Sequence, residues 1–354
     1  MNDLKKFIPE NILKMSPYVP GLQLNEEEII KLNTNENPYP LPEFILDSLL
    51  NIVKKNRFHL YPDPESLELR KKLSNIYKKD IKNILIGNGS DEILSIVFRT
   101  FLTKEDRVLF VEPSYSLYSV LCNSLGVNYY TTPVEKDFTI DIDKIIEYEK
   151  KYDPKLIIIT NPNAPTGISL SKKKIKELCE NIQKPILIDE AYVFFGGESV
   201  SEEAGILYPH LMVCSTFSKA FSLAGMRLGW ILANEFFIEQ MNKIKDSYNI
   251  NFFSQKTGEL VLDNLEYFYK RIEEIIQTRE WFIRKMDSLG YFTLPSSTNF
   301  VFTSPPDKQA KNIYEYLLKN KILVRYFSNY PEFLRISIGT QKQMETLYEI
   351  LKNY

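Results

Sequence analysis

The sequence has few of the residues on which metal sites, disulfide frameworks and histidine-based catalysis depend. Among its 354 residues are only three cysteines, Cys122, Cys179 and Cys214, and two histidines, His59 and His210. The cysteines lie far apart and match neither a zinc pattern nor a disulfide framework, so we expect them to be reduced and mostly buried. With only two histidines, a histidine zinc site and a Ser-His-Asp triad are poorly supported.

Long apolar runs and concentrated charge are also missing. No uninterrupted apolar stretch approaches the roughly 18 residues of a membrane span, and the first residues lack the apolar run of a signal peptide, so we expect a cytoplasmic protein. The net charge of -2, without a basic stripe, argues against a nucleic-acid surface. A composition of 44% hydrophobic and 25% charged residues is ordinary for a globular protein.

Short β-branched runs alternate with helical patterns, which predicts an α/β fold with a mostly parallel sheet covered by helices. The predicted strands are near-continuous apolar runs, as expected for buried parallel strands. They cover residues 83–87, 107–112, 128–132, 155–160, 185–189, 211–215 and 229–233. Apolar residues at three- and four-residue spacing predict helices between them. These helices cover residues 91–102, 142–152 and 171–181.

The spacing of apolar residues changes at about residue 235, and from there to residue 289 it is mostly that of helices. Beyond it, strands at 299–303, 321–325 and 333–337 and a helix at 308–319 indicate a smaller α+β domain. We therefore predict two domains, as the chain length favours. Residues 1–35 form an N-terminal arm that contributes to the small domain and the active site, residues 36–238 the large domain, and residues 239–354 the small one.

The most informative motif surrounds Lys219, in the run from Ser215 to Gly229. The hydroxyls of Thr216 and Ser218 flank the lysine, and the guanidinium of Arg227 follows it, a grouping that suits a bound phosphate beside a reactive carbonyl. Desolvation or neighbouring cations make a lysine nucleophilic, and a Schiff base with an aldehyde cofactor is its usual covalent use. An isolated Ser-Lys pair would more often be a solvated turn, so the other motifs decide the matter.

A glycine-containing turn follows the first strand of the predicted large sheet and opens a helix. Backbone N–H groups of Gly89, Ser90 and Asp91 can receive an anion there. The same residues would also serve as a tight turn with a helix cap, and that alternative stays open. Glu92 occupies the third glycine position of a dinucleotide fingerprint, so this motif gives little support to a Rossmann site.

Two polar residues end predicted strands, which is where open α/β sheets bind ligands. Asn161 begins a turn that Pro162 and Pro165 make rigid, and it either faces a ligand or merely caps the turn. Asp189 ends a buried strand, where an unpaired charge is costly, so it needs a cationic partner. With Glu190 it could instead form a helix cap or a metal-ligand pair.

The residues Asn161, Asp189, Lys219 and Arg227, in this order and spacing, resemble the cofactor site of the class I and II, fold type I aminotransferases. The resemblance implies pyridoxal 5'-phosphate bound to Lys219, with Asp189 paired to its pyridinium nitrogen so that the ring accepts electrons. It further implies that Asn161 donates a hydrogen bond to the phenolic oxygen of the cofactor. Lys219 then moves the proton from the substrate α-carbon.

The same resemblance assigns the remaining cofactor contacts. Tyr192 reaches the phenolic oxygen, Tyr115 stacks on the ring, and Thr216, Ser218 and Arg227 complete the phosphate site. The full implied set is Tyr61, Gly89, Ser90, Asp91, Tyr115, Asn161, Asp189, Tyr192, Thr216, Ser218, Lys219 and Arg227. Since Tyr61 matches a tyrosine that reaches the phosphate of the neighbouring subunit, a homodimer with shared active sites follows.

Several further segments, among them residues 32–40 and 333–339, resemble the histidinol-phosphate branch of this family over nearly the whole chain. In that branch the residues matching Arg335 and Arg325 bind the acidic group of the substrate, and the residue matching Tyr18 closes over the pocket. Ala164 stands where much of the family carries Asn, a departure that could tune substrate choice.

The predicted reaction is amine transfer from L-histidinol phosphate to 2-oxoglutarate in histidine biosynthesis. An aromatic amino-acid aminotransferase is the first alternative, followed by a threonine-phosphate decarboxylase. A regulator that binds the cofactor without catalysis is a third. It is disfavoured because only about 30 residues precede the first cofactor motif, too few for a DNA-binding domain of typical size.

Overall fold

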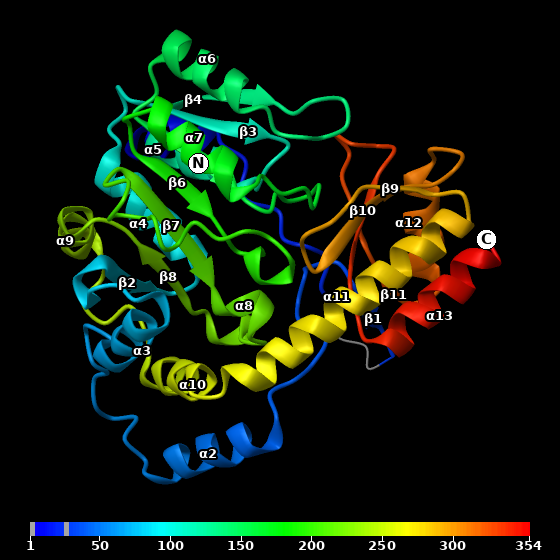
Figure 1. Ribbon diagram of the computed structural model, residues 1–354, viewed down its shortest axis with the longest axis horizontal. Coiled ribbons are helices and arrows are strands. Elements are labelled where there is room, and N and C mark those ends of the chain that lie inside the picture. The colour runs from blue at the N-terminus through cyan, green and yellow to red at the C-terminus, as the bar shows by residue number, and fades with distance from the viewer. Residues whose placement is uncertain (1–3, 25–27) are drawn as a thin grey trace.

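A seven-stranded sheet organises the larger part of the protein (Figure 1). The computed structural model describes residues 4–24 and 28–354, so the first three residues and residues 25–27 of the predicted N-terminal arm lie outside the described part. The strand order is β2-β8-β7-β6-β5-β3-β4. The strands are β2 (Ile84–Gly87), β3 (Arg107–Glu112), β4 (Asn128–Pro133), β5 (Leu156–Thr160), β6 (Ile186–Asp189), β7 (Leu211–Thr216) and β8 (Gly229–Leu232).

The sheet is mostly parallel, as predicted. Only β8 runs antiparallel to its two neighbours, β2 and β7. The central strands carry continuous apolar side chains because helices cover both faces. In β5, Ile157 and Ile159 enter the hydrophobic core on one face, and Leu156 and Ile158 enter the core on the other.

Helices cover the two faces in separate groups. Ile93, Tyr118 and Ile238 bring α4, α5 and α9 to one face, and apolar residues of α3, α6, α7 and α10 line the other. These helices are α3 (Leu67–Tyr77), α4 (Ser90–Phe101), α5 (Leu117–Leu125), α6 (Ile142–Tyr152), α7 (Lys172–Asn181), α9 (Glu235–Ile244) and α10 (Phe252–Leu262). Three shorter or peripheral helices are α1 (Glu10–Lys14), α2 (Glu43–Lys54) and α8 (Phe217–Ala220).

The smaller part of the protein, on the right in Figure 1, is built on a four-stranded antiparallel sheet of order β12-β13-β10-β9. Its elements are β9 (Phe292–Thr293), β10 (Phe300–Ser304), α12 (Ala310–Lys319), β11 (Ile322–Leu323), β12 (Arg325–Tyr326), β13 (Leu334–Ser337) and α13 (Gln341–Lys352). The N-terminal arm joins this part through β1 (Ile30–Lys31), which pairs in parallel with β11. The boundary near residue 238 stays a prediction.

The single strand predicted at residues 321–325 is wrong. The chain forms β11 and β12 there, in two different sheets. β11 pairs with the N-terminal arm, whereas Arg325 in β12 pairs with Arg335 in β13. A local apolar pattern carries no information about a partner almost 300 residues away, so it could not reveal the division.

The long helix α11 (Leu265–Ser288) runs from α10 beneath the large sheet to the small part, beside α13 (Figure 1). Its buried Arg279 donates hydrogen bonds to the carbonyls of Phe195, at 2.7 Å, and Thr298, at 2.8 Å. One side chain thus satisfies backbone groups from both parts of the protein. These two hydrogen bonds hold α11 against both parts of the protein.

The three cysteines are free and buried, which confirms the expectation from their spacing. In the described part of the chain no helix combines the length and apolar character that crossing a membrane requires.

The Arg279 contacts predict a specific loss of stability. Arg279→Met should lower the free energy of unfolding by about 2–4 kcal/mol, because the substitution leaves two buried carbonyls without a donor. Chemical denaturation measures the change. The matched control is Arg284→Met, at an exposed position of the same helix, which should change stability by less than about 0.5 kcal/mol. Equal effects of the two substitutions would contradict the role given to Arg279.

Candidate active site

A cavity of about 770 Å³ lies where the carboxyl ends of β3, β5, β6 and β7 face the small part of the protein. Parallel strands present their carboxyl ends at one edge of the sheet, so polar residues distant in sequence meet there. Most of the predicted site residues line this cavity: Tyr18, Ser90, Asp91, Tyr115, Asp189, Tyr192, Thr216, Ser218, Lys219, Arg227, Arg325 and Arg335.

The turn before α4 supplies one end of the cavity. Gly89 has a φ of +81°, and a Cβ atom there would come within 2.6 Å of the Arg227 guanidinium, so only glycine fits. Gly89 itself lies behind the wall, which Ser90 and Asp91 form. The free N–H groups at the start of this helix can donate hydrogen bonds to a bound anion.

A guanidinium and two hydroxyls complete that end of the cavity. Arg227 lies 2.9 Å from the Asp91 carboxylate, which also accepts a hydrogen bond from Tyr115 at 3.1 Å. The Thr216 hydroxyl lies 2.9 Å from that of Ser218 and accepts the backbone N–H of Ser218 at 3.1 Å. Together with the start of α4, these groups place hydrogen-bond donors and a cation at one end of the cavity, which is suited to an anion.

Lys219 lies in the short helix α8, directly after Ser218, and forms part of the cavity wall. Its amine donates a hydrogen bond to the carbonyl of Thr34 at 3.0 Å. Burial, followed by the positive charge of Arg335, lowers the pKa of Lys219 to about 8. A larger fraction of this amine is therefore neutral, and nucleophilic, near neutral pH than is the case for a solvated lysine.

Asp189 ends β6 at the floor of the cavity and is almost fully buried. It accepts hydrogen bonds from the Tyr118 hydroxyl, at 2.9 Å, and from the backbone N–H of Ala191, at 3.2 Å. Burial raises the pKa of Asp189 to about 6, an effect that the Tyr118 hydrogen bond partly offsets. No described cation pairs with this carboxylate, so the site can accept a cationic group from a ligand.

Glu190 turns away from Asp189, which argues against the metal-pair alternative. Its carboxylate accepts hydrogen bonds from the hydroxyl of Ser199, at 2.6 Å, and from the backbone N–H of Val200, at 2.7 Å. Both acceptor oxygens are thus occupied by protein donors. Burial raises the pKa of Glu190 to about 7.

Asn161 is not brought to the cavity. Its side chain closes the proline-containing turn by accepting the backbone N–H of Leu170, at 2.7 Å, and donating to the Leu170 carbonyl, at 3.2 Å. Ala164 lines the cavity instead. The structure thus favours the turn-capping alternative for Asn161. The sequence indicates this departure from the family pattern through Ala164, which stands where much of the family carries Asn.

Tyr61 also lies away from the cavity of its own chain. It is 81% exposed and stacks on Tyr248 with ring centroids 4.4 Å apart. Its side chain is therefore accessible to another protein molecule. The predicted homodimer stays a prediction.

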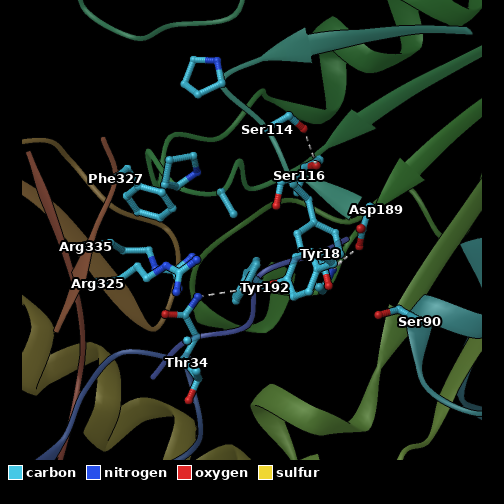
Figure 2. Close-up of a pocket in the computed structure, with 18 of the residues that line it drawn as sticks. Tyr18, Thr34, Ser90, Ser114, Ser116, Asp189, Tyr192, Arg325, Phe327 and Arg335 are labelled. Carbon is cyan, nitrogen blue, oxygen red and sulfur yellow. Dashed lines mark hydrogen bonds between the residues drawn. The ribbon is translucent and has the colours of Figure 1, made fainter. Parts of the chain in front are cut away.

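The opposite wall of the cavity carries two guanidinium groups from the small part. Figure 2 shows Arg325 and Arg335 side by side, across the cavity from Ser90 and Asp189. Arg335 donates a hydrogen bond to the carbonyl of Asn33 at 3.0 Å, and its guanidinium carbon lies 5.3 Å from the ring centroid of Phe300. Burial lowers the pKa of Arg335.

Among the described residues these arginines have no acidic partner. Arg325 donates only to the backbone carbonyls of Val19 and Pro20, each at 3.1 Å. The Nε atom of Arg335 is buried with no hydrogen-bond partner. Within the described ranges neither guanidinium forms an ion pair with a carboxylate, so this wall is suited to a ligand with a strong negative charge.

Several residues of the site escaped the sequence reasoning. One of them is Asn35, which donates a hydrogen bond to the Tyr192 hydroxyl at 3.0 Å. Glu112 and Tyr330 also line the cavity. Asn35 belongs to the segment 32–40, which resembles the family as a whole, and Glu112 ends a predicted strand, but neither residue type indicates a site contact by itself.

The fold and this site define an enzyme of the aminotransferase type. The family described as aminotransferase class I and II matches residues 27–351, and the chain belongs to this family. A histidinol-phosphate aminotransferase of Clostridium botulinum is 41% identical over 349 residues, 97% of each chain.

Solved structures show the same architecture. The histidinol-phosphate aminotransferase of Clostridium acetobutylicum matches with a TM-score of 0.84 and 26% identity, over 92% of this chain and 98% of the other. The enzyme of that name from Sinorhizobium meliloti, in complex with pyridoxal 5'-phosphate, matches with a TM-score of 0.89 and 21% identity over 98% of each chain. The fold type predicted from the sequence is confirmed.

The lowered pKa of Lys219 predicts a pH-dependent stability in protein freed of small ligands. Because the folded-state pKa of about 8 lies below the ordinary value of 10.5, the folded protein releases the proton first, and its stability rises as pH increases between these values. Lys219→Met lacks this dependence. The melting temperature of the variant minus that of the wild type should therefore decrease as the pH is raised from about 7 to about 10. A difference independent of pH would contradict the assigned shift.

Proposed function

We propose that this aminotransferase uses pyridoxal 5'-phosphate to transfer the amine of L-histidinol phosphate to 2-oxoglutarate, giving imidazole acetol phosphate and L-glutamate. The observation that carries the proposal is the pair of arginines without acidic partners, Arg325 and Arg335, on the wall opposite Ser90 and Asp189. A pair of cations matches the charge of a doubly charged phosphate more closely than that of a singly charged carboxylate. The names of the full-length relatives support the same substrate.

The residues of the cavity fit pyridoxal 5'-phosphate. The start of α4, Thr216, Ser218 and Arg227 would hold the phosphate, and Asp189 would receive the protonated ring nitrogen that its unpaired, buried carboxylate requires. When bound, the cofactor supplies an aldehyde for covalent attachment of amines and an electron-accepting ring. Tyr115 would lie against the ring.

The Tyr192 hydroxyl would contact the phenolic oxygen of the cofactor. Asn35 holds this hydroxyl at 3.0 Å, and the Asn35 side chain is itself fixed, because its amide oxygen accepts the Ser337 hydroxyl at 2.9 Å. Ala164 offers no hydrogen bond at the wall, so we assign the contact to Tyr192 alone.

Lys219 performs the two tasks that the reaction requires of the protein. Its amine would hold the cofactor before the substrate arrives, and as a free amine it would take the proton from the α-carbon of the substrate. A pKa of about 8 leaves a useful fraction of this amine neutral, and therefore basic, near neutral pH. Tyr18, packed on Tyr115, would exclude water from the reacting atoms.

The wider organisation is part of the same proposal. Residues 36–238 form the cofactor domain and residues 239–354 the small domain, which with the N-terminal arm binds the acidic end of the substrate. A cytoplasmic homodimer would bring the exposed Tyr61 of one subunit to the phosphate of the other. The substrates are small molecules.

Substrate choice is tested by mixing the cofactor-loaded enzyme with single amine donors. L-Histidinol phosphate should convert the absorption of the bound cofactor to that of its amine form within one turnover, and more rapidly than phenylalanine or threonine phosphate. Lys219→Ala should lower the rate by at least about 10³-fold, since covalent attachment and proton transfer are both lost. Faster conversion with phenylalanine would instead identify an aromatic aminotransferase, and carbon dioxide release from threonine phosphate a decarboxylase.

Arg335 should govern binding of acidic substrates. Arg335→Ala is expected to lower kcat/KM for both L-histidinol phosphate and L-glutamate by about 30-fold to 1,000-fold, since a charge-assisted contact in a buried site contributes about 2–4 kcal/mol. Steady-state kinetics measure the change, and the cofactor absorption should persist. Loss of that absorption with an unchanged KM would show that Arg335 is structural.

A further inference from the structure

The carboxylates that line the cavity are Asp91, Glu112 and Asp189, and they differ in their partners. Asp91 is paired with Arg227 at 2.9 Å. Asp189 faces the place proposed for the cofactor nitrogen. Glu112 forms no ion pair within the described residues, and the protein group that contacts its carboxylate is the Tyr330 hydroxyl, which donates to it at 3.0 Å. One acidic group of the cavity thus remains to be explained.

Glu112 lies at the end of β3 beside an aromatic wall. Side chains alternate along a strand, so Glu112 and Phe110 project to the same face. The neighbouring strand β4 contributes Tyr129 and Thr131, and Thr131 lies opposite Phe110 in the register. The rings of Phe110 and Tyr129 are stacked with centroids 5.2 Å apart, and both residues line the cavity. This corner combines ring surfaces with a single carboxylate.

Tyr330 reaches Glu112 from the small part, in the segment between β12 and β13. The same segment contains Phe327, whose ring centroid lies 5.5 Å from the guanidinium carbon of Arg335. The carboxylate is therefore held by the part of the protein that also carries the two arginines. Burial raises the pKa of Glu112, and the Tyr330 hydrogen bond acts in the opposite direction.

The charges of the cavity form a pattern that few amine donors match. Arg325 and Arg335 are suited to an anion, and Glu112 is suited to a hydrogen-bond donor or a cation. An imidazole ring carries an N–H donor and has an ordinary pKa near 6.5, so it either donates as a neutral ring or binds as a cation. A phenyl ring can do neither. Because Glu112 is an exposed residue, its carboxylate keeps water as a partner beside a phenyl ring, and the preference rests on the charge-assisted hydrogen bond that an imidazole N–H gains.

We propose that Glu112 is the residue that selects the imidazole ring of the substrate: its carboxylate accepts the ring N–H while Tyr330 holds the carboxylate in place. The inference rests on the proposed function and deepens it, because it explains how a phosphate with an imidazole side chain is preferred to one with a phenyl side chain. Phe110 and Tyr129 supply ring surfaces to the same corner, and Arg325 and Arg335 bind the phosphate in either case.

A matched pair of substrates isolates this contact. L-Histidinol phosphate and L-phenylalaninol phosphate share the amine and the phosphate and differ only in the ring. The wild-type enzyme should favour the imidazole compound in kcat/KM. In Glu112→Gln the ratio of the two kcat/KM values should fall about tenfold, mainly through KM for the imidazole substrate, because a neutral amide accepts a weaker hydrogen bond than a carboxylate.

Two further variants separate recognition from a structural link between the two parts of the protein. Glu105→Gln, an exposed position before the opposite end of β3, should leave the ratio unchanged. Tyr330→Phe removes the same hydrogen bond between the parts but keeps the carboxylate, so the ratio should fall less than in Glu112→Gln. An equal loss for both substrates in Glu112→Gln and in Tyr330→Phe would overturn the inference and indicate a structural link.

The failure of this inference is distinguishable from the failure of the proposed function. A wild-type enzyme that reacts with neither phosphate compound would overturn the proposed function. A wild-type enzyme that uses the two compounds equally well, or a Glu112→Gln variant whose ratio is unchanged, would overturn only the role of Glu112.

Discussion

The site depends on one short segment of the N-terminal arm, residues 33–35, which lies between the two parts of the protein. The Thr34 carbonyl accepts the hydrogen bond of Lys219, and the Asn33 carbonyl accepts that of Arg335. The next residue, Asn35, donates to Tyr192 of the large part and accepts from Ser337 of the small part. The Lys219 amine and the Arg335 guanidinium are thus positioned by adjacent carbonyls. A shift of this segment would move them together.

The second constraint is the charge balance of the cavity. A buried charge without a partner is expensive, yet Asp189 is buried and Arg335 is half-buried, and neither forms an ion pair among the described residues. The stability lost at these positions is recovered when a ligand supplies the missing charges. Such a site favours ligands that carry a cation at one end and an anion at the other. The unpaired charges therefore indicate which charges the ligand carries more directly than the fold does.

Much of the large sheet could be predicted because its information is local. Strands buried on both faces read as continuous apolar runs, and the predicted bounds at residues 107–112 match β3. The prediction failed at residues 321–325, where two short strands join different sheets, because pairing with a distant arm leaves no local trace. It also failed for Asn161, whose motif position suggested a ligand contact although its amide satisfies the backbone of its own turn.

The sequence by itself determined the α/β class and the family, and it directed attention to Lys219, Asp189 and Arg227, which the structure places on one cavity, because these residues lie in compact motifs at strand ends. Only the tertiary structure decided which polar groups remain without partners inside the cavity. In the sequence Glu112 looks like any acid at a strand end, and Arg335 stands out only through the family resemblance. Their significance comes from long-range packing, which gives Asp91 a cation and leaves Glu112 and Arg335 facing the space where a ligand binds.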